Sequence, residues 1–176
     1  MLGRLIDQLR EQLAVPVTTQ SKGMCGPATL QAVLKYWGHD ASEKEIARLS
    51  GATRWDGVTP DGLCKAARHF GCRTWMWDGA DYRELERWVA RGVPVIVDWW
   101  SVDAGHYSVV LGFGSNKNGK RGIKIMDPEY GANRIIDLPS FSRRWFGFDD
   151  QKKHDGVSHR LAILVLPDEA AQALRK

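Results

Sequence analysis

Apolar residues in the first half of the chain recur every three to four positions, which is the spacing of amphipathic helices. We expect four helices between residues 27 and 92, because each apolar stretch begins at a capping or proline signal and ends at a glycine. The first helix is expected to have Pro27 in its first turn and to continue over 28–37, and the second to cover 46–49 after the capping box that begins at Ser42. The third is expected to start at 59–61 and run through Phe70, and the fourth to start at 81–84 and end at Gly92. The alternating segment 72–77 predicts one strand between the last two helices.

The second half of the chain changes to runs of β-branched and other apolar residues separated by turn residues. We expect strands over 93–100, 106–113, 123–126, 134–138 and 159–166, a hairpin turn at 116–119, a helical turn at 141–146 and a short helix over 168–174. Helices followed by an antiparallel sheet predict an α+β fold. In this fold the N-terminal helical part packs on the C-terminal sheet, and a cleft lies between the two.

A chain of 176 residues without internal repeats or a long linker predicts one domain over residues 1–176. Leu2, Leu5, Leu9 and Leu13 have helical spacing, so residues 1–14 are expected to form a helical N-terminal extension and residues 167–176 a C-terminal tail. Charges throughout the N-terminus argue against a secretory signal, and no apolar run approaches the length of a membrane span. These features predict a cytoplasmic protein without a transmembrane segment.

Composition narrows the classes of partner. The net charge of +4 is small and the basic residues are scattered among acidic ones, so we expect no nucleic-acid binding. Three cysteines without a CxxC pair or a His/Cys ligand spacing argue against a disulfide framework and a zinc site. We therefore expect no metal and no cofactor. Most of the eight tryptophans are expected in the core, and the others are available to line a groove.

Four residues in chain order carry the candidate chemistry: Gln20, Cys25, His106 and Asp127. Cys25 comes at the expected start of the first helix, where the helix end stabilises a thiolate, and His106 opens an apolar strand. Asp127 closes another strand and precedes a proline. Nucleophile, general base, base-orienting carboxylate and oxyanion donor are the parts of a thiol acyl-transfer site. In a fold where helices pack against a sheet, residues that are far apart in the sequence can meet in the cleft between the two.

Each of these residues also has a structural interpretation. A buried cysteine at a helix start, a histidine that opens a strand, an Asp-Pro turn and a surface glutamine are all common. Asp98 and Asp103 are rivals to Asp127 as the carboxylate beside His106, because they lie close to that histidine in sequence. The order of the set and its position at element boundaries favour the catalytic interpretation.

At these residues the chain resembles papain-like cysteine peptidases, and specifically the bacterial bacteriocin-processing peptidases. That family forms N-terminal domains of peptide-exporting ABC transporters and also has stand-alone members. The resemblance extends over about residues 15–148, and its blocks are Gln20 with 25–28, 57–63, 92–96, 105–110 and 127–131. It implies that Cys25 is the nucleophile, His106 the base, Asp127 the orienting residue and Gln20 part of the oxyanion hole. Four residues separate Gln20 from Cys25, where many members have five.

The resemblance also implies a stand-alone cysteine peptidase that acts on a peptide or protein through a thioester. Gly23, Gly26 and Gly105 are expected to leave room for the substrate, and Trp55, Trp99, Trp100 and Tyr107 to crowd the cleft walls. Gly26, Gly105, Tyr107 and Trp100 are the expected substrate-binding residues, with a preference for small residues such as Gly-Gly before the cut bond. A thiol acyltransferase or amidase, and a silent peptide-binding module, remain alternatives. The sequence leaves the oligomeric state open.

Overall fold

A computed structural model describes residues 12–102, 104–148 and 156–174. Its helices are α2 (Cys25–Tyr36), α3 (Glu43–Ser50), α4 (Pro60–His69), α5 (Tyr82–Ala90), α6 (Leu138–Ser142) and α7 (Asp168–Ala173). Its strands are β1 (Cys72–Trp77), β2 (Val95–Trp100), β3 (Gly105–Ser115), β4 (Arg121–Asp127), β5 (Ala132–Asp137), β6 (Phe146–Phe148), β7 (Val157–His159) and β8 (Ala162–Pro167). Within this described part, no helix is both long enough and apolar enough to cross a membrane.

The predicted α+β fold is confirmed. Six strands form one sheet in the order β1-β8-β2-β3-β4-β5, and every neighbouring pair is antiparallel. Strand β1 comes from the first half of the chain, yet it pairs with β8 from the end. The division into a helical half and a sheet half therefore holds except for this edge strand and for the short helices α6 and α7 in the second half.

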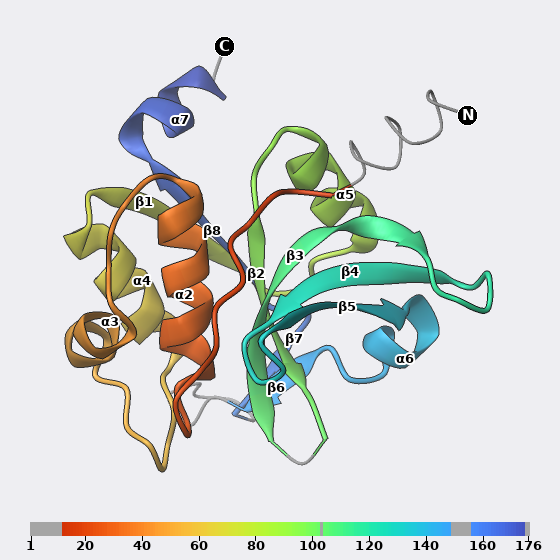
Figure 1. Cartoon of the computed structure of the whole chain (residues 1–176), viewed down its shortest axis with the longest axis horizontal. Coiled ribbons are helices and arrows are strands. Elements are labelled where there is room, and N and C mark those ends of the chain that lie inside the picture. The colour runs from red at the N-terminus through yellow and green to blue at the C-terminus, as the bar shows by residue number, and fades with distance from the viewer. Residues whose placement is uncertain (1–11, 103, 149–155, 175–176) are drawn as a thin grey trace.

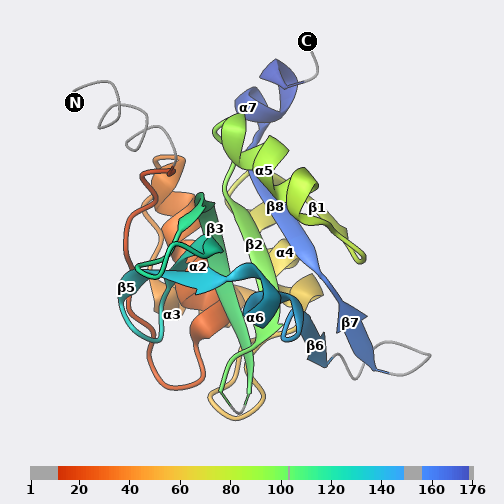
Figure 2. The same cartoon turned by 90° about the vertical axis from the view of Figure 1, so that its right-hand side faces the viewer.

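Two apolar cores lie on opposite faces of the sheet. One is built from α2, α3 and α4 against one face, with Leu30, Ile46 and Leu63 fully or almost fully buried. The other is built from α5, α6 and α7, and Leu85 and Phe141 have no exposed surface there. Figure 1 shows α2, α3 and α4 on one side of the strands and α5 and α6 on the other. Figure 2, turned by 90°, shows α5 and α7 beside β8 and β1.

The helix starts follow the predicted caps. Ser42 accepts a hydrogen bond from the Glu45 backbone, Thr59 accepts one from Gly62, and Asp81 forms a reciprocal capping box with Glu84. These caps satisfy backbone N–H groups that have no partner inside the helix. Local sequence signals therefore determine where α3, α4 and α5 begin, whereas the N-cap residue of α2, Met24, makes no side-chain capping hydrogen bond.

Three predictions about elements were wrong in part. The helical turn comes earlier than expected, as α6, because Asp137 caps it by accepting from the Ser140 backbone. The strand expected over 159–166 is split into β7 and β8 at Arg160, which has a positive φ of 54°. The predicted N-terminal helix lies outside the described residues up to residue 11. Its last turn is extended instead, since Leu13 donates from its backbone to Leu111 O at 2.8 Å.

Candidate active site

Cys25 is the first residue of α2 and is half-buried. Its thiol is free, as are those of Cys64 and Cys72. The first turn of α2 contains no acidic residue, so no side-chain charge offsets the positive end of the helix dipole near the sulfur. The sulfur thus lies at the positive end of this helix dipole.

His106 is the second residue of β3 and only 3% of its surface is exposed. Its ring packs edge-on against the buried Trp99, with ring centroids 5.7 Å apart. Its Nε2 lies 2.8 Å from Asp127 Oδ1. The ring is thus fixed by an indole on one side and by a carboxylate at one nitrogen.

The environment of His106 favours its protonated form. Burial lowers the pKa of the ring, but hydrogen bonds with Asp127 and Cys25 and the charges of both outweigh burial and raise the pKa from 6.5 to about 9. The hydrogen bond with Cys25 also places the thiol beside this ring. Thiol, imidazole and carboxylate therefore form one continuous chain of polar contacts.

Asp127 ends β4 and is completely buried. Its Oδ1 also accepts the Glu129 backbone N–H at 3.1 Å, and its Oδ2 accepts Arg134 Nη1 at 2.6 Å. Burial raises the pKa of Asp127, but the hydrogen bonds and charges of His106 and Arg134 outweigh it and lower the pKa below its usual range. The carboxylate consequently stays ionised next to the ring.

The predicted contact between Asp127 and the ring of His106 is present. Of the two rival carboxylates, Asp98 is buried in the wall of a pocket near Cys25. Asp103 lies outside the described residues. Among the three candidates the structure therefore pairs Asp127 with His106.

Gln20 lies beside the turn between β4 and β5. Its backbone N–H donates to Pro128 O at 3.0 Å, one residue from Asp127. Its side-chain Oε1 is buried and has no hydrogen-bond partner among the described residues. This places Gln20 next to the His106–Asp127 pair, while its role in an oxyanion hole stays a prediction.

A pocket of about 360 Å³ opens beside Cys25, between the helical side and the sheet. Three of the predicted substrate-binding residues line it, namely Trp100, Gly105 and Tyr107. The remaining wall is formed by Gly23, Trp55, Asp56, Gly57, Val58, Asp98, Ala104 and Phe148. The rim is apolar, because Trp55 is 76% exposed and Phe148 is 60% exposed.

Two expectations about this cleft need correction. Gly26 was expected to leave room for substrate, but Val58 fills the space beside it: a Cβ at Gly26 would lie 2.3 Å from Val58 Cγ1. Trp99 was expected in a cleft wall, but it is 1% exposed and supports His106 from the core. Helix packing against Val58 thus requires glycine at position 26. Trp99 is a core residue that packs against the imidazole ring of His106.

One group of described residues has the spacing of metal ligands: His106, Asp127 and Glu129, whose ligand atoms lie within 4.8 Å of one another. The second oxygen of Asp127 already accepts the Arg134 guanidinium, and that positive charge repels a cation at this position. We therefore assign the group to the His–Asp pair. The expectation of a metal-independent reaction stays a prediction.

Sequence reasoning missed two polar residues that hold the site. Arg134 binds Asp127, and buried Thr29 donates its hydroxyl to Tyr107 O at 3.0 Å. Thr29 carried a signal, because it is a polar residue one turn after Cys25 on an otherwise apolar helix face. Arg134 carried none, because its partner lies on the neighbouring strand.

Comparison with known proteins gives concordant matches. The profile of the peptidase C39 family matches residues 14–148. The peptidase domain of Streptococcus ComA, a bi-functional ABC transporter involved in quorum sensing, is 26% identical with a TM-score of 0.67, covering 88% of this chain and 99% of that domain. A double-glycine-motif protease from an AMS/PCAT transporter, solved with its leader peptide, is 23% identical with a TM-score of 0.66, covering 90% and 95%. An uncharacterised protein of Methanothermobacter marburgensis is 35% identical over 122 residues, which is 68% of this chain and 75% of that protein.

Proposed function

The chain belongs to the peptidase C39 family, and from this membership we propose that it is a cysteine peptidase that hydrolyses peptide bonds through a thioester. The observation that carries the proposal is the continuous contact of Cys25, His106 and Asp127. A nucleophile hydrogen-bonded to a base, which a carboxylate orients, is the geometry that acyl transfer requires. Cys25 is the nucleophile, His106 the base and Asp127 the orienting residue.

The reaction proceeds in two halves. The Cys25 thiolate attacks the carbonyl carbon of the substrate, and the imidazolium of His106 gives its proton to the leaving amine as the C–N bond breaks. Water then attacks the thioester while His106 takes a proton from it, and cleavage of the C–S bond releases the carboxylic acid and restores the Cys25 thiolate and the His106 imidazolium. Asp127 holds the ring in one orientation throughout.

The negative charge on the carbonyl oxygen needs donors during both halves. The backbone N–H of Cys25 lies at the start of α2, where it has no partner inside the helix. The side-chain amide of Gln20 is the second donor in this proposal. Preorganised donors of this kind are each worth about 3–4 kcal/mol of barrier reduction.

The substrate is a peptide or protein with a small residue before the cut bond. Gly23 and Gly57 line the pocket with positive φ values of 76° and 66°, and Trp55, Trp100 and Tyr107 narrow it. Aromatic walls exclude bulky side chains by overlap and bind extended backbone. The complex of a double-glycine-motif protease with its leader peptide supports the same preference, Gly-Gly or a similarly small pair.

Cytoplasmic location is part of this proposal, because a catalytic thiol works in its reduced form and the three cysteines are free. A thiol acyltransferase or amidase would share the first half of the reaction and differ in the group that resolves the thioester. A silent binding module would bind peptide with no turnover.

The test is peptide turnover by the wild-type chain and by Cys25→Ala and His106→Ala. We expect both variants to fold and to lose most of the rate, and the double variant to lose little more, because the two residues act as a unit. Mass spectrometry of the products distinguishes a free acid from an amide formed with an added amine. Substantial turnover in either single variant would refute the assignment.

A peptide library varied at the two positions before the bond tests the substrate preference. Efficient cleavage after bulky residues would contradict it. Binding of a peptide without any cleavage would favour the silent module.

A further inference from the structure

The carboxylate of Asp127 divides its two oxygens between a ring and a guanidinium. Oδ1 faces His106 Nε2 at 2.8 Å and also accepts the Glu129 N–H, while Oδ2 accepts Arg134 Nη1 at 2.6 Å. Asp127 has no exposed surface, so water does not replace either partner. Rotation of the carboxylate would break a charge-assisted hydrogen bond at each end. Arg134 therefore restricts the direction in which Oδ1 points.

The position of Arg134 is set by its strand and by one ring contact. Strand β5 carries it two residues beyond Ala132, which pairs with Asp127 across β4 and β5. Its guanidinium stacks 3.8 Å from the centroid of the Tyr130 ring. A planar guanidinium can stack through its face and donate through its edge at the same time, which an ammonium group does not do. The arrangement thus uses properties particular to arginine.

We propose that Arg134 is a positioning residue of the reaction, which orients Asp127 toward His106 and limits, by its positive charge, how strongly that carboxylate favours the protonated ring. The proposal rests on the proposed function, because it assumes that His106 is the base. It adds a fourth ionic member to the Cys25–His106–Asp127 chain. Arg134 acts through Asp127 and does not touch the reacting atoms.

The charged groups around the ring set the sign of the effect. They come from every element packed on the pair: Cys25 from α2, Asp98 from β2, Asp127 from β4, Glu129 from the turn that follows, Arg134 from β5 and Arg144, whose guanidinium lies over the Trp99 ring. The anions favour an imidazolium. Arg134 is the cation bound directly to the carboxylate that holds the ring, so it opposes the charge of Asp127.

Loss of the Arg134 charge and loss of the Asp127 charge should therefore shift the pKa of the His106 ring in opposite directions. Without Arg134, the pKa of His106 should rise further above its value of about 9. Without the Asp127 charge, the pKa of His106 should fall. A residue that only stabilised the fold would loosen the His106–Asp127 pair, and its loss would lower the pKa of His106 as well.

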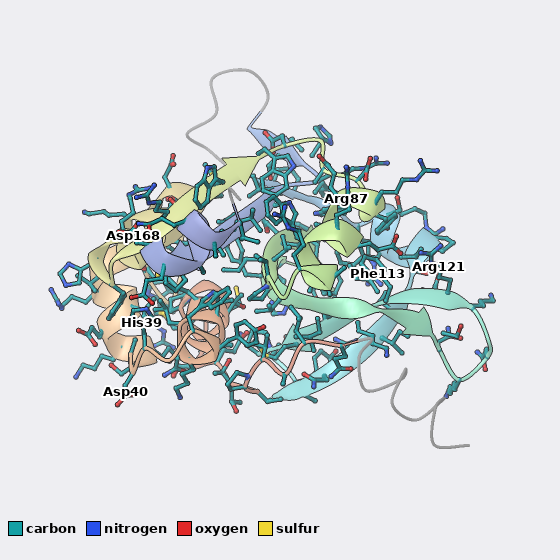
Figure 3. The ribbon with its side chains drawn as sticks, turned by 90° about the horizontal axis from the view of Figure 1, so that it is seen from above. His39, Asp40, Arg87, Phe113, Arg121 and Asp168 are labelled. Atoms are coloured by element: carbon teal, nitrogen blue, oxygen red, sulfur yellow. The ribbon has the colours of Figure 1, made fainter. Side chains whose placement is uncertain are left out.

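The experiment is an NMR titration of the His106 ring in the full chain, with the signal assigned by its absence in His106→Gln. Arg134→Met removes the charge and keeps the length of the side chain, and Arg134→Lys keeps the charge. Asp127→Asn serves for comparison, because it should shift the pKa of His106 in the opposite direction. The matched control is Arg121→Met, which breaks an arginine–carboxylate pair with Glu86. Arg121 begins β4 whereas Asp127 ends it, and Figure 3 shows Arg121 on the right of the view, away from the orange helices on the left.

We expect Arg134→Met to raise the midpoint of the ring titration by on the order of one pH unit and Asp127→Asn to lower it. Arg134→Lys should stay near wild type in the titration, and Arg121→Met should match wild type. An unchanged or lowered midpoint in Arg134→Met would overturn the proposal, as would an equal shift in Arg134→Lys. If Arg134→Met does not fold, Arg134→Gln must show the same upward shift.

Turnover measured on the same variants separates this proposal from the proposed function. The ring titration does not depend on catalysis, so it reports on Arg134 even if no peptide is cleaved. If Cys25→Ala retains turnover, the proposed function fails whatever the titration shows. If Cys25→Ala is inactive and the Arg134 variants titrate like wild type, only the role of Arg134 fails.

Discussion

The hydroxyl of Thr29 donates to the carbonyl oxygen of Tyr107 at 3.0 Å, and this bond joins helix α2 to strand β3. Thr29 comes one helical turn after Cys25, and Tyr107 is the residue next to His106. A fully buried hydrogen bond at this place fixes the helix that carries the thiol to the strand that carries the ring. The distance between nucleophile and base therefore depends on a contact that neither of them makes.

Substitution of Thr29 by valine should reduce both stability and turnover. The change keeps the shape and leaves a buried carbonyl with one partner fewer, which costs about 1–3 kcal/mol of unfolding free energy. Chemical denaturation and peptide turnover measure the two effects. Thr29→Ser, which keeps the hydroxyl, is the control and should stay closer to wild type in turnover. Equal turnover in the valine variant would show that the bond does not position the site.

Cys25 should be the thiol that reacts first. Burial raises the pKa of Cys64, and burial raises the pKa of Cys72 to about 11, so both remain thiols at pH values near 6. Cys25 has an imidazolium beside it and a helix end beneath it, and both stabilise a thiolate. Iodoacetamide at about pH 6, followed by peptide mapping, should label Cys25 more than about tenfold faster than the other two cysteines. Slow and equal labelling of all three would contradict the site.

Asp127→Asn should lower turnover at neutral pH and leave the thiol in place. The amide keeps the shape of the carboxylate but loses the charge that favours the imidazolium. The ring of His106 is therefore held less firmly and is protonated less readily. We expect a loss of about 10² to 10⁴ in kcat. Alkylation of Cys25 by a small reagent should remain measurable in this variant. Wild-type turnover in Asp127→Asn would move the orienting role to another group.

The protonated ring of His106 should make stability depend on pH. Its pKa is raised from 6.5 to about 9 in the folded chain, so the stabilisation is complete below about pH 6.5 and is lost as the pH rises through about 9. Denaturant unfolding between pH 6 and pH 9.5 should show this decline, on the order of a few kcal/mol. His106→Gln should flatten the curve over this window. A wild-type curve already flat there would indicate that the ring is neutral in the fold.

Gly26→Ala should destabilise the chain although alanine favours helices. The added Cβ would lie 2.3 Å from Val58 Cγ1 and 3.2 Å from Tyr107 Cδ2, and the branched valine has little freedom to yield. Overpacking of this kind costs about 1–3 kcal/mol. Truncation of the neighbour in Gly26→Ala with Val58→Ala should recover stability, and thermal unfolding of the two variants measures this. A stable single variant would show that α2 can shift.

Short-range signals made much of the fold predictable. Caps at Ser42, Thr59 and Asp81 determine helix starts within a few residues, and alternation identifies β1 without any knowledge of its partner. The placement of β1 beside β8 was not predictable, because that pairing joins residues 85 to 95 positions apart whose side chains fit many neighbours. The break between β7 and β8 at Arg160 was also not predicted, because Arg160 has a positive φ although it is neither a glycine nor next to a proline.

The site divides in the same way. Cys25, His106 and Asp127 could be chosen because each stands at an element boundary and their order resembles a known family. Thr29 and Arg134 support them from inside a helix and a strand. Thr29 carried only the signal of a polar residue on an apolar helix face, and the role of Arg134 is revealed by its tertiary contact alone. Gly26 was chosen correctly as unusual, but its reason is the side chain of Val58 and not the substrate.

The position of β8 between β1 and β2 has a consequence for how the chain matures during synthesis. Leu161, Ile163 and Val165 form part of the core beneath α2, so the helix that carries Cys25 has no complete surface to rest on until residues 161–165 have been made. The contacts that close this core span most of the chain, and such long-range pairing forms late and slowly. The core that supports the helix of the catalytic thiol is therefore complete only after synthesis has passed residue 165.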